Sequence, residues 1–283
     1  MKAYFGPGGN SEAFKTAGGR STIEAPSFIK NIGLDAYEYE AGNGLSASAA
    51  MLSAIGEQAR IHNVRMSFHT PYFISLSGVV PEKRLKSINY IRESLDAAHL
   101  LGAGTIVVHS GSAAKITRDE AMRLASDTLI KTLENVETYG IKIGLETMGK
   151  VNQLGTLDEV LELCRIDNAF VPVVDFGHLN ARDRGGVFNT ADDYLRVFDK
   201  IDRCLGSDVA KNLHCHFSKI EWTDAGEKRH LTFSDDVYGP SFEPLVETIV
   251  KNELTPTIIC ESAGTQSDDA ILMKKYYERL KGI

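Results

Sequence analysis

The sequence has no uninterrupted apolar run that approaches the roughly 20 residues of a transmembrane helix. Its amino terminus, MKAYFGPGGNSEAF, lacks the apolar stretch of a secretory signal peptide. The four cysteines form no CxxC pair, and three of them lie in apolar stretches, as reduced and buried thiols do. We therefore expect a cytoplasmic protein that does not associate with membranes.

The sequence also lacks a net positive charge, because 38 Asp and Glu residues outnumber 31 Lys and Arg residues. The formal net charge is −7 and the isoelectric point is near 5.7. This balance disfavours broad nonspecific binding to nucleic acids, although it leaves room for a local basic patch. The sequence has no GxGxxG after its first predicted strand and no GxxxxGK motif followed by Ser or Thr, and GPGGN (6–10) is typical of a structural turn. We expect no nucleotide cofactor.

The chain does contain a regular alternation of short β-branched or aromatic runs with longer segments of helical period. The predicted strands are residues 2–7, 34–39, 64–70, 105–111, 142–148, 170–176, 212–219 and 255–262. Apolar residues at helical spacing predict helices around residues 85–98 and 122–136, and a last helix is predicted at 268–283. Eight strand-then-helix units without a linker predict one α/β domain over residues 1–283, a single (β/α)₈ TIM barrel with its active site at the carboxyl ends of the strands. The alternative is a doubly wound open sheet.

Imidazoles and carboxylates fall at the ends of six consecutive predicted strands. These residues are His69, His109, Glu146, Asp175, His214 or His216, and Glu261. One such residue is readily explained as a helix cap or a structural hydrogen bond, but six in succession are not. Since converging carboxylates repel one another, the pattern predicts a site for cations.

The segment NLHCHFSK (212–219) leaves one ligand undecided. Successive side chains of a strand point to opposite faces, so His214 and His216 share one face and Cys215 takes the other. The local sequence does not choose between the two histidines.

Mixed imidazole and carboxylate donors suit Zn²⁺, with Mn²⁺ or Fe²⁺ as alternatives. Such a site supports phosphoester hydrolysis, and it also supports the isomerisation or epimerisation of a sugar or sugar phosphate. A third interpretation is a metal-dependent sensor or binding protein without catalysis.

Six motifs together resemble the endonuclease IV family, which lies within the xylose-isomerase-like TIM-barrel superfamily. They are SFHTPY (67–72), VVHSGS (107–112), LETMGKVNQLG (145–155), DFGH (175–178), HCHFSK (214–219) and CES (260–262). The resemblance implies a zinc-dependent hydrolase that cuts duplex DNA on the 5′ side of abasic sites in base-excision repair. The acidic stretch AYEYEAGNG (36–44) departs from the family, whose corresponding loop carries a basic residue.

The resemblance also implies ligands for two or three zinc ions. One ion would be held by His69, His109 and Glu146, and a second by Glu146, Asp175, His214 and Glu261; Glu146 and Glu261 would be the catalytic residues. His214 is preferred to His216 because it precedes Lys219 by five residues, as in the family. At the third site, the family's Asp-x-His pair is replaced by Lys228-Arg229-His230. We expect a third ion held by His178, His216 and His230, or its replacement by the charge of Lys228, with Glu227 or Asp224 as further candidates.

Several residues near these motifs are expected to contact the substrate. Tyr72 and Phe73 lie where the family inserts side chains into the base stack, and an aromatic wedge stabilises unstacked DNA. Arg182, Lys219 and Lys228 would supply a local basic surface.

Overall fold

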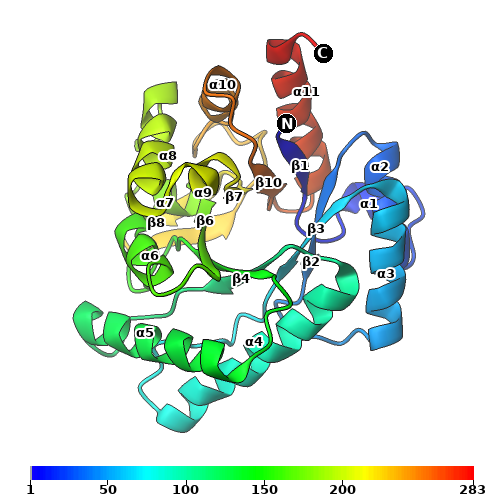
Figure 1. Cartoon of the computed structure of the whole chain (residues 1–283). Coiled ribbons are helices and arrows are strands. Elements are labelled where there is room, and N and C mark those ends of the chain that lie inside the picture. Colours follow the sequence, from blue (N-terminus) through cyan, green and yellow to red (C-terminus); the bar gives the residue numbers. More distant parts are fainter. Residues whose placement is uncertain (1) are drawn as a thin grey trace.

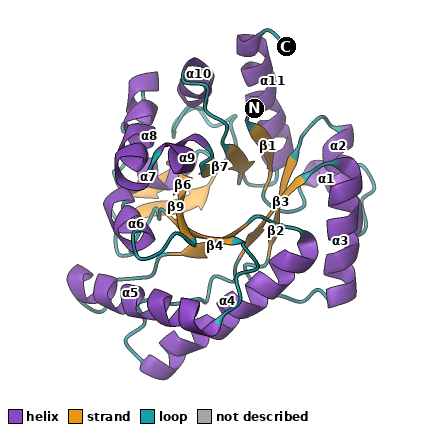
Figure 2. Ribbon diagram, viewed as in Figure 1, coloured by secondary structure: helices purple, strands orange, loops and turns teal. Residues whose placement is uncertain are grey.

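A ring of eight parallel strands surrounded by helices forms the centre of the computed structural model, which describes residues 2–283 (Figure 1, Figure 2). The strands of the ring are β1 (Tyr4–Pro7), β2 (Ala36–Glu40), β3 (Arg65–His69), β4 (Thr105–His109), β5 (Lys142–Glu146), β6 (Phe170–Asp175), β7 (His214–Phe217) and β10 (Thr257–Cys260). Each lies within one of the eight predicted runs, or within one residue of it. The prediction of a (β/α)₈ barrel is confirmed.

The helices follow the strands in the order that the barrel requires. They are α1 (Glu12–Thr16), the 3₁₀ helix η1 (Thr22–Glu24), α2 (Ala25–Asn31), α3 (Ala49–His62), α4 (Pro81–Leu101), α5 (Arg118–Asn135), α6 (Leu157–Cys164), α7 (Phe176–Arg182), α8 (Ala191–Leu205), α9 (Ser207–Lys211), α10 (Glu243–Lys251) and α11 (Gln266–Lys281). In the described chain, residues 2–283, no helix is long and apolar enough to cross a bilayer.

The three helices expected from apolar spacing are α4, α5 and α11. In α4 the side chains of Ile88, Ile91 and Leu95 are buried, as their spacing predicts, whereas Leu85 is exposed near the first turn. The helix begins with Pro81, and proline is suited to this position because the first N–H groups of a helix have no partner within it. Gly102 follows the last turn with the left-handed backbone conformation that commonly ends a helix.

The ring closes between β1 and β2. The amide of Asp35 donates a hydrogen bond to the carbonyl of Phe5 (3.1 Å), and the amide of Gly9 donates to the carbonyl of Glu38 (2.9 Å). The two strands approach so closely that a methyl group on Gly6 would lie 1.7 Å from the carbonyl oxygen of Ala36. Gly6 is therefore required for closure, which brings the end of β2 beside the other strand ends.

A hairpin that we did not predict covers part of the barrel mouth. It consists of β8 (Ile220–Thr223) and β9 (Gly226–His230), which pair antiparallel directly after β7. The hairpin docks on the loop after β5, because the amide of Glu227 donates to the carbonyl of Gly149 (3.0 Å) and the amide of Val151 donates to Ala225 (3.0 Å). This contact fixes the position of β9 relative to the strand ends.

We predict that Gly6→Ala lowers the free energy of unfolding by about 3 kcal/mol, because the added methyl group has no space at the closure. Urea denaturation followed by circular dichroism measures the effect. The matched control is Gly104→Ala, since a methyl group on Gly104 meets no atom within 4 Å, and a change of less than about 0.5 kcal/mol is expected there. Equal stability of the two variants would contradict the role of Gly6.

Candidate metal centre

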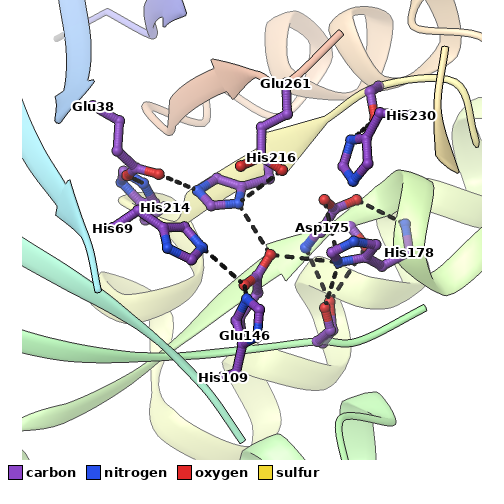
Figure 3. A network of polar contacts seen from close by, with 12 residues as sticks. Glu38, His69, His109, Glu146, Asp175, His178, His214, His216, His230 and Glu261 are labelled. Carbon is purple, nitrogen blue, oxygen red and sulfur yellow. Dashed lines mark hydrogen bonds and ion pairs between the residues drawn. The ribbon is translucent and has the colours of Figure 1, made fainter. Parts of the chain in front are cut away.

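A cavity of about 890 Å³ opens at the carboxyl ends of the strands. Its walls include His69, His109, Glu146, His178, Glu227, His230 and Glu261. Figure 3 shows how the imidazoles and carboxylates of this region point toward one another from different strands. Their convergence follows from the barrel, which brings the ends of all its parallel strands to one face.

Glu146, the last residue of β5, lies at the centre of the cluster and is buried. Four imidazoles surround its carboxylate. Oε2 is 3.5 Å from His69 Nε2 and 3.2 Å from His109 Nε2. Oε1 is 3.4 Å from His178 Nδ1 and 3.1 Å from His216 Nδ1. A single carboxylate therefore connects both sides of the cavity.

Among residues 2–283, five groups of donor atoms are each compact enough to surround one ion; two of them contain Glu38, with His214 and His216 or with Glu40 and Glu261, and the other three are the candidate sites. These three groups are His69, His109 and Glu146; Glu146, Asp175, His216 and Glu261; and His178, Glu227 and His230. Within each group the donor atoms lie within 4.8 Å of one another. Glu146 belongs to the first two groups, as a bridging ligand would.

For two histidines, the hydrogen-bond partner shows which ring nitrogen carries the proton. Nδ1 of His69 lies 2.9 Å from the carbonyl of Thr70, and Nδ1 of His178 lies 3.0 Å from the carbonyl of Thr147. Because a carbonyl only accepts, Nδ1 carries the proton in both rings. Nε2 of His69 is left to face Glu146, and Nε2 of His178 is left to face Glu227. Anchored imidazoles of this kind are typical of metal ligands.

The structure corrects the expectation for β7. His216, and not His214, joins Asp175 and Glu261 in the second group. The reason is the strand register, because His216 lies opposite Asp175 at the end of β6, whereas His214 lies opposite Val173, two residues lower. Both imidazoles point into the barrel, but only His216 reaches the level of the other strand ends.

The third group contains His178 and His230, as expected, and of the two further candidates it contains Glu227, whose Oε2 lies 3.4 Å from His178 Nε2. Lys228 points away, because neighbouring residues of β9 alternate between its two faces. Its Nζ lies 2.6 Å from Glu221 Oε1, and its side chain is 55% exposed. Lys228 therefore does not replace an ion in this cluster, and His216 belongs to the second group.

The two aromatic residues expected to contact the substrate have different surroundings. Tyr72 lines the cavity, its ring centre is 5.3 Å from that of His69, and it is 56% exposed. Phe73 packs edge-on against Tyr90 at 4.7 Å and lines a separate depression outside the cavity. Only Tyr72 is placed at the predicted site.

Arg182 and Lys219, which were also expected to contact the substrate, hold loops instead. The guanidinium of Arg182 donates to four carbonyls of the loop after β5, those of Met148, Lys150, Val151 and Gln153. Nζ of Lys219 donates to the carbonyls of Phe233 and Asp235. These charges are used to position the rim of the cavity, and their nitrogens are occupied.

Two carboxylates of β2 escaped the sequence analysis. The sequence predicts a strand at 34–39, but the acidic stretch 36–44 was considered only for its lack of a basic residue, whereas both Glu38 and Glu40 of β2 lie near the cluster. The alternation in AYEYE was the available signal, since it places the two glutamates on one face and the two tyrosines on the other. Burial and the charges of nearby carboxylates raise the pKa of Glu40 to about 8.

The pKa values express the charge balance of the cluster. Burial would raise the pKa of Glu146, but contacts with imidazoles, His109 first, hold it well below its ordinary value. Burial would lower the pKa of His216, but the charge of Glu261 raises it well above its ordinary value. Burial raises the pKa of Asp175 to about 6. The buried carboxylates thus need positive charge nearby, which imidazolium groups or bound cations supply.

The donor set fits divalent metal ions. Glu146 Oε2 and Asp175 Oδ2 are buried, and neither accepts a hydrogen bond from any residue of the described chain, 2–283. An unsatisfied buried carboxylate oxygen is costly unless a cation is bound beside it. Three and four donors per group, mixed between imidazole and carboxylate, match the preferences of zinc and of manganese or iron.

Comparisons with known proteins agree with this architecture. A sequence model of the family described as xylose isomerase-like TIM barrel matches residues 26–277. The chain is 20% identical to a solved D-tagatose 3-epimerase-like protein, with a TM-score of 0.72, over 99% of this chain and 98% of the other. At that identity the likeness shows the fold.

Two relatives are informative at the level of sequence. An uncharacterized protein of Methanocaldococcus jannaschii is 28% identical over 271 residues, which cover 94% of this chain and 97% of the relative. A probable endonuclease 4 of Acholeplasma laidlawii is 31% identical over 166 residues, which cover 57% of this chain and 55% of the relative. The match to the second relative therefore spans about half of its length.

The charge balance predicts how pH changes the stability of metal-stripped protein. The pKa of His69 is raised from 6.5 to about 10, because the charges of Glu40 and Glu146 outweigh the effect of burial. Its contribution to stability is fully present below pH 6.5 and is lost as pH rises through about 10. We expect the free energy of unfolding to fall between about pH 6.5 and about pH 10, with the same sign from the raised pKa of His216.

Urea denaturation in the presence of a chelator measures this dependence. Protein loaded with zinc is the control, and there the decline should be smaller, because deprotonated imidazoles bind metal. A free energy of unfolding that rises with pH in the chelator-treated protein would contradict the assignment of charge.

Proposed function

The chain belongs to the xylose isomerase-like TIM-barrel family, and from that premise we propose that it is a metal-dependent phosphodiesterase of the endonuclease IV type. The proposed reaction is hydrolysis of duplex DNA on the 5′ side of an abasic site. The observation that carries the proposal is the presence of three donor groups around one cavity, two of which share Glu146. A phosphodiester spreads negative charge over several oxygens during cleavage, so three positive centres suit it.

The proposed ligands are the three groups themselves, with zinc as the first candidate and manganese or iron as alternatives. When bound, the ions would supply electrostatic stabilisation for the phosphate oxygens and for the leaving oxygen.

The residues of the chain have separate tasks in this proposal. Glu261 lies at the cavity with 16% of its side chain exposed, so it can accept a hydrogen bond from the attacking water and orient it. Glu146 is buried among imidazoles and belongs to both the first and the second group, so it would fix the two metal sites relative to each other. Tyr72 and Lys150 line the cavity and are the proposed contacts for the nucleotide and its phosphate.

Arg182 has an indirect task in place of the expected substrate contact. By holding the carbonyls of the loop after β5, it fixes the part of the rim that carries Lys150 and Gln153. Lys219 does the same for the segment that contains Phe233. Both are proposed to position the rim.

A second candidate is a metal-dependent sugar or sugar-phosphate isomerase or epimerase. It is favoured by the second group, Glu146, Asp175, His216 and Glu261, which offers four donors to one ion that could chelate sugar oxygens and polarise a carbonyl. The group of His178, Glu227 and His230 distinguishes the two candidates, because an isomerase has no evident use for it.

We predict that zinc-loaded protein cuts a labelled duplex on the 5′ side of a single abasic-site analogue, and that Glu261→Gln lowers the rate by at least about 100-fold. The amide has nearly the shape of the carboxylate but accepts hydrogen bonds at only one atom. Gel electrophoresis of the labelled strand measures both the position and the rate of cleavage.

Glu134→Gln is the matched control, because Glu134 is exposed on α5, outside the cavity. The same protein is incubated with sugars and sugar phosphates. Turnover of a sugar without incision of the duplex would favour the second candidate, and incision that persists in Glu261→Gln would exclude the role of Glu261.

The third group generates a separate prediction. Glu227→Gln should lower the zinc content by about one ion per chain, because it removes the only carboxylate of that group. Lys228→Ala should leave the zinc content unchanged, since its charge is paired with Glu221 at the surface. Elemental analysis after dialysis measures both, and loss of zinc in the Lys228 variant alone would reverse the assignment.

A further inference from the structure

Glu38 is a buried carboxylate that crosses the barrel from β2 to β7. Its side chain is fully buried, and its two oxygens contact the two histidines of HCHF. Oε1 lies 2.8 Å from His216 Nε2, and Oε2 lies 2.9 Å from His214 Nε2. Glu38 belongs to none of the three groups that we propose as ligands, although its carboxylate also lies within 4.8 Å of donor atoms of His214 and His216 and, separately, of Glu40 and Glu261.

The position of Glu38 is fixed by the closure of the barrel. Its carbonyl accepts the hydrogen bond from the amide of Gly9 that joins β1 to β2. The backbone of Glu38 is therefore held on the side of the ring opposite β6, and Figure 3 shows the imidazole of His216 between Glu38 and Glu146. The main chain of Glu38 is thus fixed by the barrel, which limits how far its carboxylate can follow a movement of the His216 imidazole.

The two nitrogens of His216 face different partners. Nδ1 points to the metal centre, at 3.1 Å from Glu146 Oε1 and 3.4 Å from Glu261 Oε2. Nε2 lies 2.8 Å from Glu38 Oε1, a close contact whose angle falls short of a hydrogen bond, and it has no hydrogen-bond partner among residues 2–283. A deprotonated Nε2 would hold its lone pair against a carboxylate oxygen, so the contact with Glu38 favours a proton on Nε2. Nδ1, which is hydrogen-bonded to Glu146, is then the nitrogen available to a metal ion.

The other imidazoles show what this contact does. The carbonyls of Thr70 and Thr147 hold the proton on Nδ1 of His69 and His178, so that each ring presents Nε2 to the cavity. His216 is turned the other way, and no backbone carbonyl reaches its Nε2 in the described chain, 2–283. Glu38 takes the place of such a carbonyl.

We propose that Glu38 is a positioning residue that fixes the tautomer and orientation of His216, so that Nδ1 is presented to a metal ion held with Glu146, Asp175 and Glu261. The inference rests on the proposed metal-dependent function and assigns a role to a residue outside the ligand groups. His214 completes the arrangement by donating Nε2–H to the second oxygen of Glu38.

The two histidines explain why a carboxylate is needed. Each presents Nε2 to one oxygen of Glu38, at 2.9 Å for His214 and 2.8 Å for His216, so the group between them must offer an acceptor atom to both. A glutamine at this position would accept at its carbonyl but present an NH₂ donor to the other imidazole. One of the two rings would then lose its hydrogen bond or change its tautomer.

The test compares wild-type protein with Glu38→Gln and Glu38→Asp, and with Glu134→Gln as the exposed control. Zinc affinity is measured by competition with a chromogenic chelator, and the visible absorption spectrum of the cobalt-loaded protein reports the ligand field. Glu38→Gln should weaken binding of one ion by about 10-fold to 100-fold and alter the cobalt spectrum. Glu38→Asp keeps the carboxylate and should recover part of the affinity.

A measurement on wild-type protein avoids dependence on the folding of a variant. Nitrogen-15 NMR of zinc-loaded protein should show His216 protonated at Nε2, and protonation at Nδ1 would overturn the inference. Circular dichroism and thermal unfolding in chelator identify any variant that is misfolded, and for such a variant the NMR result decides.

The remaining outcomes separate this inference from the proposed function. Wild-type protein that binds no divalent ion would overturn both. Wild-type protein that binds zinc with the same affinity as Glu38→Gln would overturn only the positioning role. A fourth ion in wild-type protein that is absent in Glu38→Gln would also overturn it, because Glu38 would then be a ligand.

Discussion

The structure of the barrel mouth depends on one constraint, the burial of the Glu146 carboxylate among four imidazoles at 3.1 to 3.5 Å. A carboxylate without water is stable only where positive charge lies close to it. Strands β3, β4 and β7 meet that requirement with His69, His109 and His216, and α7 meets it with His178; the topology of the barrel brings these side chains together. Glu146 also joins two donor groups, so its position couples the ligands of β3 and β4 to those of β6, β7 and β10.

The hairpin β8–β9 and the loop after β5 lie outside the strand ring and form part of the cavity rim. The hairpin β8–β9 carries Glu227 and His230 to the side of His178, and its hydrogen bonds to the loop after β5 hold it there. Arg182 binds the carbonyls of that same loop, so the third donor group and the rim depend on each other. A surface with a net charge of −7 can still bind a phosphate here, because the bound cations rather than the surface would supply the attraction.

The sequence was sufficient for the barrel and for most of the centre, because strand runs and their terminal residues depend on short periodic patterns. It did not decide between His214 and His216, since both share a face and only the register against Asp175 separates them. The sequence also did not predict where the side chain of Lys228 points, because the β8–β9 hairpin is short and polar and shows no apolar periodicity. Once β9 is known to be a strand, Glu227 and Lys228 are seen to lie on opposite faces of it. Glu38 and Glu40 were overlooked although the strand at 34–39 was predicted, because the search for ligands considered only the ends of the six later strands.

The most direct measurement is anomalous X-ray scattering at the zinc edge from crystals of zinc-loaded protein. The account predicts two peaks on either side of Glu146, each at about 2.0–2.2 Å from one of its oxygens, and a third peak among His178, Glu227 and His230. It further predicts that Nδ1 of His216 is the ligating nitrogen. The absence of any peak beside Glu146 in a well-ordered crystal would contradict the central claim that this carboxylate bridges two metal ions.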